Sequence, residues 1–507
     1  MFIRKKKNSS GSITVLIIEK RNRRNIILKN IGTSTDAVEI DYLYSKALKE
    51  TERLNQSPQL PFDKDKELEY ADSFTNCIDS FYLIGPELLL GKLFDDIGFN
   101  AIPNELFRHL VLTRLVYPVS KLKTVDYLLK YKGIQMSVYS IYRYLDTLHK
   151  SYIENVKQIS LQHTLSIFNN KIAVVFYDVT TLYFETKYED DFKKMGFSKD
   201  GKHQQPQIVL GLLVSDQGYP LDYHVFEGDQ YEGNTLIPVI EHFEAKHKPE
   251  QLIIVADAGL LSKNNIEAIV SKHYQYILGA RIKNQNEAVT KQILALKLND
   301  AQSWELKTAE QTRLIISYKK SRAVNDEKNR KRGLEKLKAK VKTGKLNKTH
   351  INNKGYNKYL KIDGEAKISI NEQKYNDDKK WDGLKGYITN TNLSKEIVIE
   401  QYHQLWQIEK TFRIAKSDLA IRPIYHQLKK RIEAHICIAF AACKMYKELE
   451  RQLKIKKSSL TPEKVVDILK TIYSVEFETP YSTTKYKKLI IKTNEQRDLV
   501  NLFNLKI

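Results

Sequence analysis

The sequence predicts an α/β protein of several domains, and three observations support this class. Apolar runs at residues 172–177, 207–214 and 251–256 are typical of strands that are covered on both faces. Segments with helical periodicity precede and follow these strands. The length of 507 residues is enough for three or four units at roughly 100 to 200 residues per domain.

The composition excludes several classes of protein. Hydrophobic residues make up 42% of the chain, which is ample for packed cores and excludes global disorder. The three cysteines, Cys77, Cys437 and Cys443, form no CxxC pair, so we expect neither a disulfide framework nor a cysteine-built zinc site. No stretch approaches about 18 uncharged apolar residues, and the charged N-terminus has no apolar segment behind it, so we expect no membrane span and no secretory signal.

The charge balance points to a polyanionic partner. The chain has 83 Lys and Arg against 61 Asp and Glu, a net charge of +22. Such an excess favours binding to a phosphate backbone, because each neutralised phosphate releases counterions. Nucleic acid is therefore the first partner that we expect.

The N-terminal part is predicted to contain a β-rich region followed by helices. Alternating runs at residues 12–19 and 26–31 indicate strands within a region that covers residues 1–85. Residues 86–165 then show amphipathic helices. The three clearest are residues 105–116, which end before Pro118, residues 121–131, capped by Ser120 and closed at Gly133, and residues 138–149, capped by Ser137.

This helical region can be interpreted in two ways. A helix-turn-helix-like arrangement would present Tyr139, Tyr142 and Arg143, in the first turns of the third helix, to a DNA groove. An ordinary helical bundle whose aromatic residues belong to the core is the alternative. The sequence leaves both open.

Residues 166–282 are predicted to form the first part of a catalytic core. The apolar runs at 172–177 and 251–256 end on Asp178 and Asp257. In open α/β sheets the carboxyl ends of strands are where sites are built, so we expect the two aspartates to lie at one edge of a sheet.

Residues 283–382 are predicted to form a basic inserted domain. Between residues 311 and 361 there are 17 Lys and Arg against 3 acids. A strand at 313–318 and a Lys-rich helix at 326–342 are expected, and the helix offers four DNA-contacting residues, Lys328, Arg330, Lys331 and Arg332. A solvated basic helix without a partner is the alternative.

Residues 383–450 are predicted to complete the core, with 451–507 as a C-terminal tail. A single helix is expected over residues 394–419. There Tyr402, Glu409 and Lys416 are spaced seven apart and share one face with Arg413. The alternative is an exposed face with pairs such as Glu409 and Arg413.

The three carboxylates of Asp178, Asp257 and Glu409 suggest a metal site. Mg²⁺ takes oxygen ligands and keeps waters for reaction, and two such ions suit the in-line displacement at a phosphodiester. We therefore expect two Mg²⁺ ions, with Mn²⁺ as a substitute.

Six segments, in this order and spacing, carry a family resemblance. They are VVFYDVTTLYFET (174–186), GFSKDGKHQQPQIVLGLLV (196–214), EGN (232–234), IIVADAGLLS (253–262), GYITNT (386–391) and YHQLWQIEKTFRIAKSDLAIRPIYH (402–426). Together they resemble the DDE transposases of the insertion-sequence-four superfamily, over about residues 90 to 445. The resemblance implies a ribonuclease H-like, mixed-sheet catalytic core with a β-containing insertion between the second aspartate and the glutamate.

The resemblance also implies roles for individual residues. Asp178, Asp257 and Glu409 would be the catalytic metal ligands, and Tyr402 and Lys416 would contact DNA near the cleaved end. The position of the family's signature arginine is held by Leu405. Arg413, one turn beyond Glu409, is a candidate replacement.

The function implied is DNA transposition with double-stranded DNA, both terminal inverted repeats and target, as the partner. A dimer on DNA and a place in the bacterial cytoplasm, on the nucleoid, follow from that function. A catalytically inactive DNA-binding relic and a nuclease that cleaves without joining are the alternatives.

Overall fold

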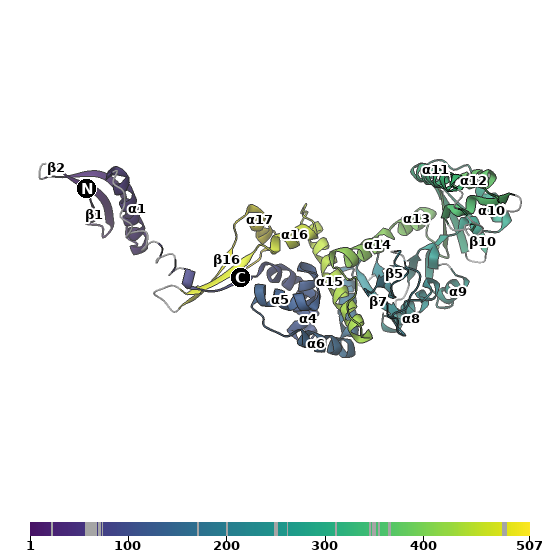
Figure 1. Cartoon of the computed structure of the whole chain (residues 1–507), viewed down its shortest axis with the longest axis horizontal. Helices are drawn as coiled ribbons and strands as arrows, with labels where there is room; N and C mark the ends of the chain where they lie inside the picture. The colour runs from purple at the N-terminus through teal and green to yellow at the C-terminus, as the bar shows by residue number, and fades with distance from the viewer. Residues whose placement is uncertain are drawn as a thin grey trace. The chain divides into compact units, whose positions relative to one another are not determined.

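The computed structural model divides the chain into two compact units, drawn in Figure 1. One comprises residues 1–81 and 475–488, and the other residues 82–474 and 489–507. The structure describes residues 1–21, 24–55, 68, 72, 75–169, 172–198, 201–247, 252–260, 262–309, 312–343, 346, 351–352, 355–363, 367–478 and 484–506. Within these residues, no helix combines the length and the apolar character needed to cross a membrane.

The smaller unit begins with an antiparallel sheet and one helix. The strands are β1 (Phe2–Lys7), β2 (Ile13–Arg21) and β3 (Arg24–Ser34), with β2 in the middle, and α1 (Ala37–Asn55) follows them. Val15 and Ile17 of β2 pack against Ile40 and Ala47 of α1, which together form a small core. The two strands expected here are present, whereas the alternating pattern gave no indication of α1. A further sheet has the strand order β16 (Lys485–Ile490), β15 (Tyr473–Glu478), β4 (Ile78–Leu83).

The larger unit starts with helices whose ends follow the caps in the sequence. A π-helical turn (Glu87–Gly91) and a 3₁₀ turn (Phe99–Ala101) flank α3 (Lys92–Ile97), and α4 (Glu105–Val116), α5 (Lys121–Lys132), α6 (Val138–Ser151) and α7 (Ile153–Ile167) follow. Ser120 and Ser137 accept backbone hydrogen bonds at the starts of α5 and α6, at 3.4 and 3.2 Å. Gly133 ends α5 in the left-handed region at φ 66°, where a side chain would be strained.

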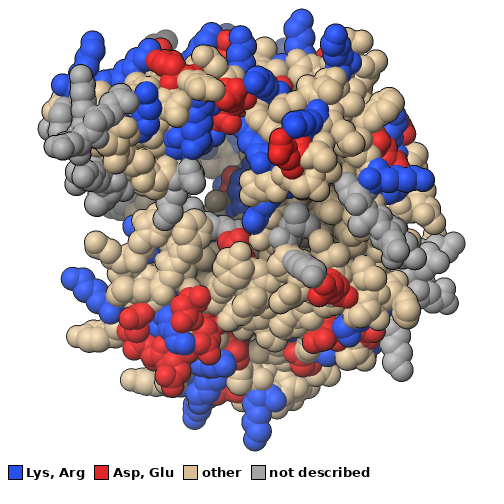
Figure 2. Space-filling model, turned by 90° about the vertical axis from the view of Figure 1, so that its right-hand side faces the viewer, with Lys and Arg blue, Asp and Glu red and all other residues tan. Residues whose placement is uncertain are grey.

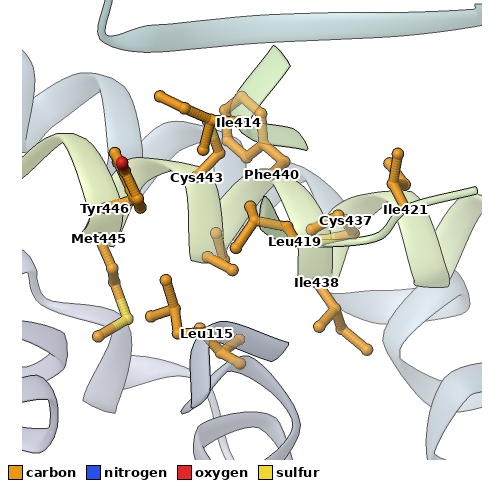
Figure 3. Packing of buried hydrophobic residues seen from close by; sticks show 14 of the residues in the cluster. Leu115, Ile414, Leu419, Ile421, Cys437, Ile438, Phe440, Cys443, Met445 and Tyr446 are labelled. Carbon is orange, nitrogen blue, oxygen red and sulfur yellow. The ribbon is translucent and has the colours of Figure 1, made fainter. Parts of the chain in front are cut away.

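A long helix, α15 (Lys429–Ile455), is the centre of the main core. Every residue from Ala434 to Leu449 is buried. Helices α4, α6 and α7 pack against it, as do strand β7 (Pro220–Phe226) and the π-helical turn η8 (Ile414–Asp418). Figure 3 shows Leu115 of α4 on one side of α15, with Ile414 and Leu419 on another. A helix that is buried on all sides has to be surrounded in this way.

One mixed sheet runs through the larger unit. Its order is β10 (Ser303–Ala309), β11 (Thr312–Tyr318), β14 (Leu384–Thr389), β9 (Gln275–Ala280), β8 (Ile253–Ala256), β5 (Val174–Tyr183), β6 (Gln207–Ser215), β7. Strands β5, β8 and β9 are parallel neighbours, and β6 and β7 continue as an antiparallel meander. This confirms the α/β class with a mixed sheet, and the order of β5 to β9 is that of the ribonuclease H-like core that the resemblance implies.

Two layers of helices cover the faces of the sheet. Val175, Tyr177 and Val179 of β5 pack with α8 (Leu236–His247) and α9 (Lys263–Ser271). Phe176 and Leu182 lie in the other cluster, with the helices that follow β14 and with α15. These helices are α13 (Lys395–His403) and α14 (Trp406–Arg413), and α16 (Pro462–Leu469) and α17 (Asn494–Phe503) come after α15.

The basic segment expected as an insertion shares the central sheet. Strands β10 and β11 extend the sheet beyond β14, with which β11 pairs. Leu314, Ile315 and Ile316 of β11 are buried, so both faces of this strand are covered. The rest of the segment consists of α10 (Glu287–Ala295), the basic helix α11 (Lys320–Lys342), a 3₁₀ turn (Gly355–Tyr359), the hairpin β12 (Leu360–Asp363) and β13 (Lys367–Ile370), and α12 (Glu372–Lys379). All of it belongs to the larger unit.

An ion pair between α6 and α15 gives a testable pH dependence. Arg431 donates to both carboxylate oxygens of Asp146, at 2.9 and 3.1 Å, and Lys430 donates at 2.9 Å. The hydrogen bond from Arg431 is the main cause that lowers the pKa of Asp146 from 3.8 to about 2. A lowered pKa in the folded state means that the pair stabilises the protein above the unfolded pKa of 3.8 and is lost as the pH falls towards 2.

We therefore expect Asp146→Asn to reduce the free energy of unfolding by about 1 kcal/mol at neutral pH, the usual scale for a solvent-accessible ion pair. The difference from wild type should shrink between pH 4 and pH 2, because the wild-type carboxylate is then protonated. Urea unfolding at several pH values measures this. A deficit that stays constant down to pH 2 would show that the charge of Asp146 is not involved.

Candidate active site

The two aspartates are placed side by side by the pairing of their strands. Asp257 follows directly on β8, as expected, whereas β5 does not end at Asp178 but continues to Tyr183, because Asp178 and the residues after it pair with β6. In the parallel ladder, Tyr177 of β5 is level with Ala256 of β8, so Asp178 and Asp257 are the next residues on neighbouring strands.

Both aspartates lie on the sheet face that α13, α14 and α15 cover. Side chains alternate along a strand, so Asp178 lies on the same face as Phe176, and Asp257 on the same face as Val255. Phe176 and Val255 belong to the core cluster that contains Phe412 of α14. The helix that carries Glu409 therefore packs on the face of the sheet to which both aspartates belong.

Tyr402 of α13 is held against Asp257. Its hydroxyl donates to Oδ1 of Asp257 at 2.7 Å, and the backbone N–H of Ala258 donates to the same oxygen at 2.7 Å. The side chain of Tyr402 is buried, and burial followed by the charge of Asp257 raises its pKa. The close approach needs Gly279 on β9, because a Cβ at that position would lie 2.4 Å from the Tyr402 oxygen. Tyr402 thus remains protonated and orients one carboxylate oxygen of Asp257.

The helix expected over residues 394–419 is interrupted. α13 ends at His403, α14 begins at Trp406, and a π-helical turn, η8, follows from Ile414. The prediction of one unbroken α-helix is therefore wrong, and the shared stripe of Tyr402, Glu409 and Lys416 that was derived from it stays a prediction. Each piece is fixed by its own contact, α13 by Asp257 and α14 by the contacts described next.

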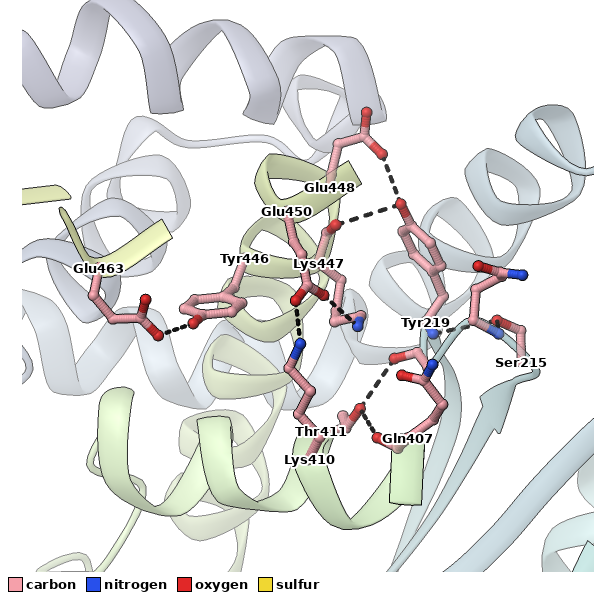
Figure 4. Close-up of polar contacts among 12 residues, drawn as sticks. Ser215, Tyr219, Gln407, Lys410, Thr411, Tyr446, Lys447, Glu448, Glu450 and Glu463 are labelled. Atoms are coloured by element: carbon pink, nitrogen blue, oxygen red, sulfur yellow. Dashed lines mark hydrogen bonds and ion pairs between the residues drawn. The ribbon is translucent and has the colours of Figure 1, made fainter. Parts of the chain in front are cut away.

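Helix α14 is tied to two neighbours, as Figure 4 shows. Oγ1 of Thr411 donates to the carbonyl of Gly218, in the turn between β6 and β7, at 3.0 Å. Lys410 forms an ion pair with Glu450 of α15, and the buried Lys447 donates to the same carboxylate at 2.6 Å. Burial raises the pKa of Glu450, but the two lysines outweigh burial and lower it. Because Lys410 and Thr411 are held in this way, α14 has a defined position while Glu409 itself is exposed.

Lys385, a lysine that the sequence did not point out as a site residue, lies near Tyr402 and within reach of the charges of Asp257 and Glu409. Lys385 of β14 is half-buried, and its ammonium group is 4.3 Å from the centre of the Tyr402 ring. Burial and the charge of Arg322 lower its pKa, while Asp257 and Glu409 act in the opposite direction. The charges of Asp257 and Glu409 therefore both reach this ammonium group. The signal in the sequence was a lysine within a short apolar strand, one residue before the segment GYITNT.

The acids suit a hard cation in kind, but they do not form a ready-made cluster. Asp178, Asp257 and Glu409 offer only carboxylate oxygens, the ligands that Mg²⁺ prefers. Among the residues that the structure describes, no three or more His, Cys, Asp or Glu side chains lie close enough together to hold a metal ion. The structure thus pairs the two aspartates and places Glu409 on the helix that covers them.

A cleft of about 570 Å³ opens in front of Asp257. Its lining includes Tyr402 of α13 and Lys385 of β14, together with Arg322 and Asn329 of α11. Figure 2 shows a hollow in this face of the molecule, below a surface that carries many Lys and Arg side chains. The basic segment thus borders the cleft in front of Asp257.

The predicted DNA-contacting residues differ in exposure. Lys328, Lys331 and Arg332 of α11 are exposed, and so are Arg413 of α14 and Tyr139 and Arg143 of α6, while Lys416 is half-buried. Arg330 departs from expectation, because its guanidinium group is buried in an ion pair with Asp382 and lies 5.3 Å from the centre of the Tyr375 ring. A charge engaged in this way supports the fold of the segment. Arg330 also lines the cleft in front of Asp257, described above, and DNA contact by it stays a prediction.

Helix α6 combines the two interpretations of the helical region. Ile141, Tyr144 and Leu145 are buried against the core, as in an ordinary bundle. Tyr139 on the opposite side is 73% exposed, and Tyr142 is half-buried with the Arg431 guanidinium 5.0 Å from its ring centre. DNA contact by Tyr139, Tyr142 and Arg143 stays a prediction.

Known proteins were compared with this chain in sequence and in structure. No curated protein matches the chain. Among solved structures, the piggyBac transposase synaptic complex with hairpin DNA is 10% identical, with a TM-score of 0.39 and coverage of 78% of this chain and 80% of that one. The Mos1 transposase paired-end complex with the left transposon end is 12% identical, with a TM-score of 0.15 and coverage of 32% of this chain and 58% of that one. The sequence model of the transposase DDE domain matches residues 169–443, which include Asp178, Asp257 and Glu409. Because this match spans more than half of the chain, the protein belongs to the DDE transposase family, whose members are metal-dependent enzymes of DNA transposition.

Proposed function

We propose that this transposase works by cutting and pasting. It binds the terminal inverted repeats of an insertion sequence, hydrolyses the bond at the 3′ end of each transposon strand, and joins these ends to target DNA. The observation that carries the proposal is the placement of Asp178 and Asp257 on adjacent strands, under the helix of Glu409 and beside a cleft with basic lining. Both steps are in-line displacements at phosphorus, so one set of carboxylates serves both.

We assign Asp178, Asp257 and Glu409 as the ligands of two Mg²⁺ ions, for which Mn²⁺ can substitute. When bound, such ions activate the attacking water or 3′-hydroxyl and stabilise the leaving oxygen. Since the described residues contain no preformed cluster of three acids, the assignment requires Glu409 to join the two aspartates when metal and DNA bind.

The residues around Asp257 have supporting roles in this proposal. Tyr402 fixes the rotation of the Asp257 carboxylate through one oxygen and leaves the other for a ligand. Lys385 and Arg322 bring positive charge to the cleft at Asp257, where a phosphate of the cleaved strand would lie.

Contacts farther along the DNA are proposed for a further set of basic and aromatic residues. They are Lys328, Lys331 and Arg332 of α11, Arg413 one turn beyond Glu409, Lys416 on η8, and Tyr139, Tyr142 and Arg143 of α6. Pairing of two transposon ends implies a dimer on double-stranded DNA. The place of action would be the bacterial cytoplasm, on nucleoid DNA.

The assignment of the three acids is tested by isosteric substitution. We expect Asp178→Asn, Asp257→Asn and Glu409→Gln each to slow Mg²⁺-dependent cleavage at the repeat end by at least about a hundredfold, the scale at which loss of one charge-stabilising group slows an enzyme. Glu400→Gln, at an exposed glutamate on α13, is the matched control and should cleave normally. Cleavage of linear duplexes, with Mg²⁺ and with EDTA, measures this. Normal cleavage by any of the three variants would remove that residue from the site, and duplex binding without any cleavage by wild type would favour an inactive relic.

The role of Tyr402 is tested by removing only its hydroxyl group. Tyr402→Phe should lower the single-turnover cleavage rate roughly 10- to 100-fold, because a hydrogen bond to a charged group contributes about 1.5–3 kcal/mol. Duplex affinity should be unchanged. Tyr387→Phe is the control, since that neighbouring hydroxyl lies 3.3 Å from Ser317 and not at Asp257. A loss of duplex affinity with a normal cleavage rate would instead make Tyr402 a DNA contact.

The basic helix α11 is tested through the salt dependence of binding. The triple variant Lys328→Gln, Lys331→Gln, Arg332→Gln should weaken duplex binding and reduce the slope of log affinity against log salt by up to about 2.7, since each phosphate contact contributes about 0.9. Lys454→Gln, Lys456→Gln, Lys457→Gln, at exposed lysines around the end of α15, makes the same change in net charge and should keep the slope. Fluorescence anisotropy measures both. Equal slopes in the triple variant and wild type would mean that α11 has a different partner.

A further inference from the structure

A second pocket, of about 410 Å³, shares no lining residue with the cleft at Asp257. It lies where the first turn of α5 meets the segment between η8 and α15. Its lining includes Arg114 of α4, Lys121 of α5, His426 in the connecting segment and His435 of α15.

Lys121 is buried in this pocket without a counter-charge. Lys121 is only 6% exposed. Within the described part of the chain, no hydrogen bond or ion pair reaches its ammonium group. Burial and the charge of Arg114 both lower its pKa. Burying an ammonium group is costly unless an anion compensates it, so this arrangement calls for a ligand.

Arg114 is in a similar position. It is 5% exposed, and its contacts are long and made to neutral groups. The guanidinium nitrogens lie 3.4 Å from the Leu419 carbonyl, 3.5 Å from the Ala420 carbonyl and 3.4 Å from Nδ1 of His435. Nε2 of His435 lies 3.1 Å from the Ile421 carbonyl, which assigns the ring proton to Nε2 and leaves Nδ1 to accept from Arg114.

The electrostatics of the pocket are one-sided. Burial, and after it the charges of Lys121 and Arg114, lower the pKa of His426 to about 3, and the same groups lower that of His435. The imidazoles are therefore neutral, and among the described residues no carboxylate acts on the pKa of Arg114, Lys121 or either histidine. The pocket also lies at the N-terminus of α5, a helix of 12 residues, where the backbone dipole favours an anion.

We propose that this pocket binds a phosphate group, and that in the working enzyme the phosphate belongs to the backbone of the bound DNA. Two buried cations and a helix N-terminus match the charge and the several acceptor oxygens of a phosphate. The DNA source rests on the proposed function, because a free phosphate ion has the same chemistry. Tyr142, one of the predicted DNA contacts, lines the pocket, and the exposed Tyr425 and Lys123 lie at it as well.

Lys121→Met tests the site, because Met keeps the length of the side chain and removes its charge. Removing an uncompensated buried charge should leave the unfolding temperature unchanged or raise it. We expect the affinity for inorganic phosphate, measured calorimetrically, and for a linear duplex carrying the element's ends each to fall about tenfold or more, as for loss of one charge-assisted contact. The slope of log duplex affinity against log salt should fall by about 0.9. Lys130→Met, at an exposed lysine of the same helix that does not line the pocket, should bind phosphate normally.

The outcomes of these measurements distinguish a phosphate of the DNA backbone from a free phosphate ion. Loss of phosphate binding with unchanged duplex affinity and slope would overturn the DNA source and assign the pocket to free phosphate. Unchanged binding of both probes would overturn the site. If Lys121→Met does not fold, wild type decides. Binding at a site should give a rise in unfolding temperature that saturates with phosphate concentration beyond the general stabilising effect of the salt, which sulfate at equal ionic strength controls for, and a purely linear rise would overturn the site. If wild type binds no duplex at any salt concentration, the proposed DNA function fails, while the phosphate titration still tests the pocket.

Discussion

The need to surround α15 determines how the larger unit is assembled. From Ala434 to Leu449 this helix has no residue that faces solvent. Cover is therefore needed on all of its sides, and the chain supplies it from separate segments: α4, α6 and α7 from the helical region, and strand β7 and η8 from the core. The helical region and the sheet that carries Asp178 and Asp257 are thus parts of one packed body.

The same helix contributes to the position of the third carboxylate. Glu409 is on a short helix that buries Ile408 and Phe412, and the place of this helix depends also on contacts with neighbours that are themselves fixed. Glu450 of α15 holds Lys410, and the turn at Gly218 holds Thr411. The backbone of the two aspartates, by contrast, is placed by strand pairing. The site therefore combines a rigid pair with a third acid whose position is set by side-chain contacts, which fits an assembly that is completed when its ligands bind.

Much of the fold and part of the site could be predicted from the sequence. Apolar runs, serine caps and Gly133 predicted the strands and helix ends correctly, because these signals are local. The motif order predicted the family and, with it, the two adjacent aspartates.

The break at residues 404–405 was missed, because a periodic pattern does not report where a tertiary contact such as that of Tyr402 with Asp257 interrupts a helix. Burial of Arg330 was missed for a similar reason, since its partner Asp382 is 52 residues away. Lys385 and Lys121 were missed because their surroundings are assembled from distant segments, although a lysine within a short apolar strand was a signal for Lys385.

The strands of the basic segment also determine where the central sheet ends. Without β10 and β11, β14 would be the last strand, and the buried Gly386 and Tyr387 would lie on an unpaired edge. Apolar edges of this kind recruit strands from other molecules and lead to aggregation. With them, the last strand is β10, which carries Glu305 and Lys307, and Glu305 is paired with Arg313 at 3.0 Å. The segment therefore protects the edge of the catalytic sheet, and a version of the enzyme from which it had been trimmed would be prone to self-association even if every catalytic residue were kept.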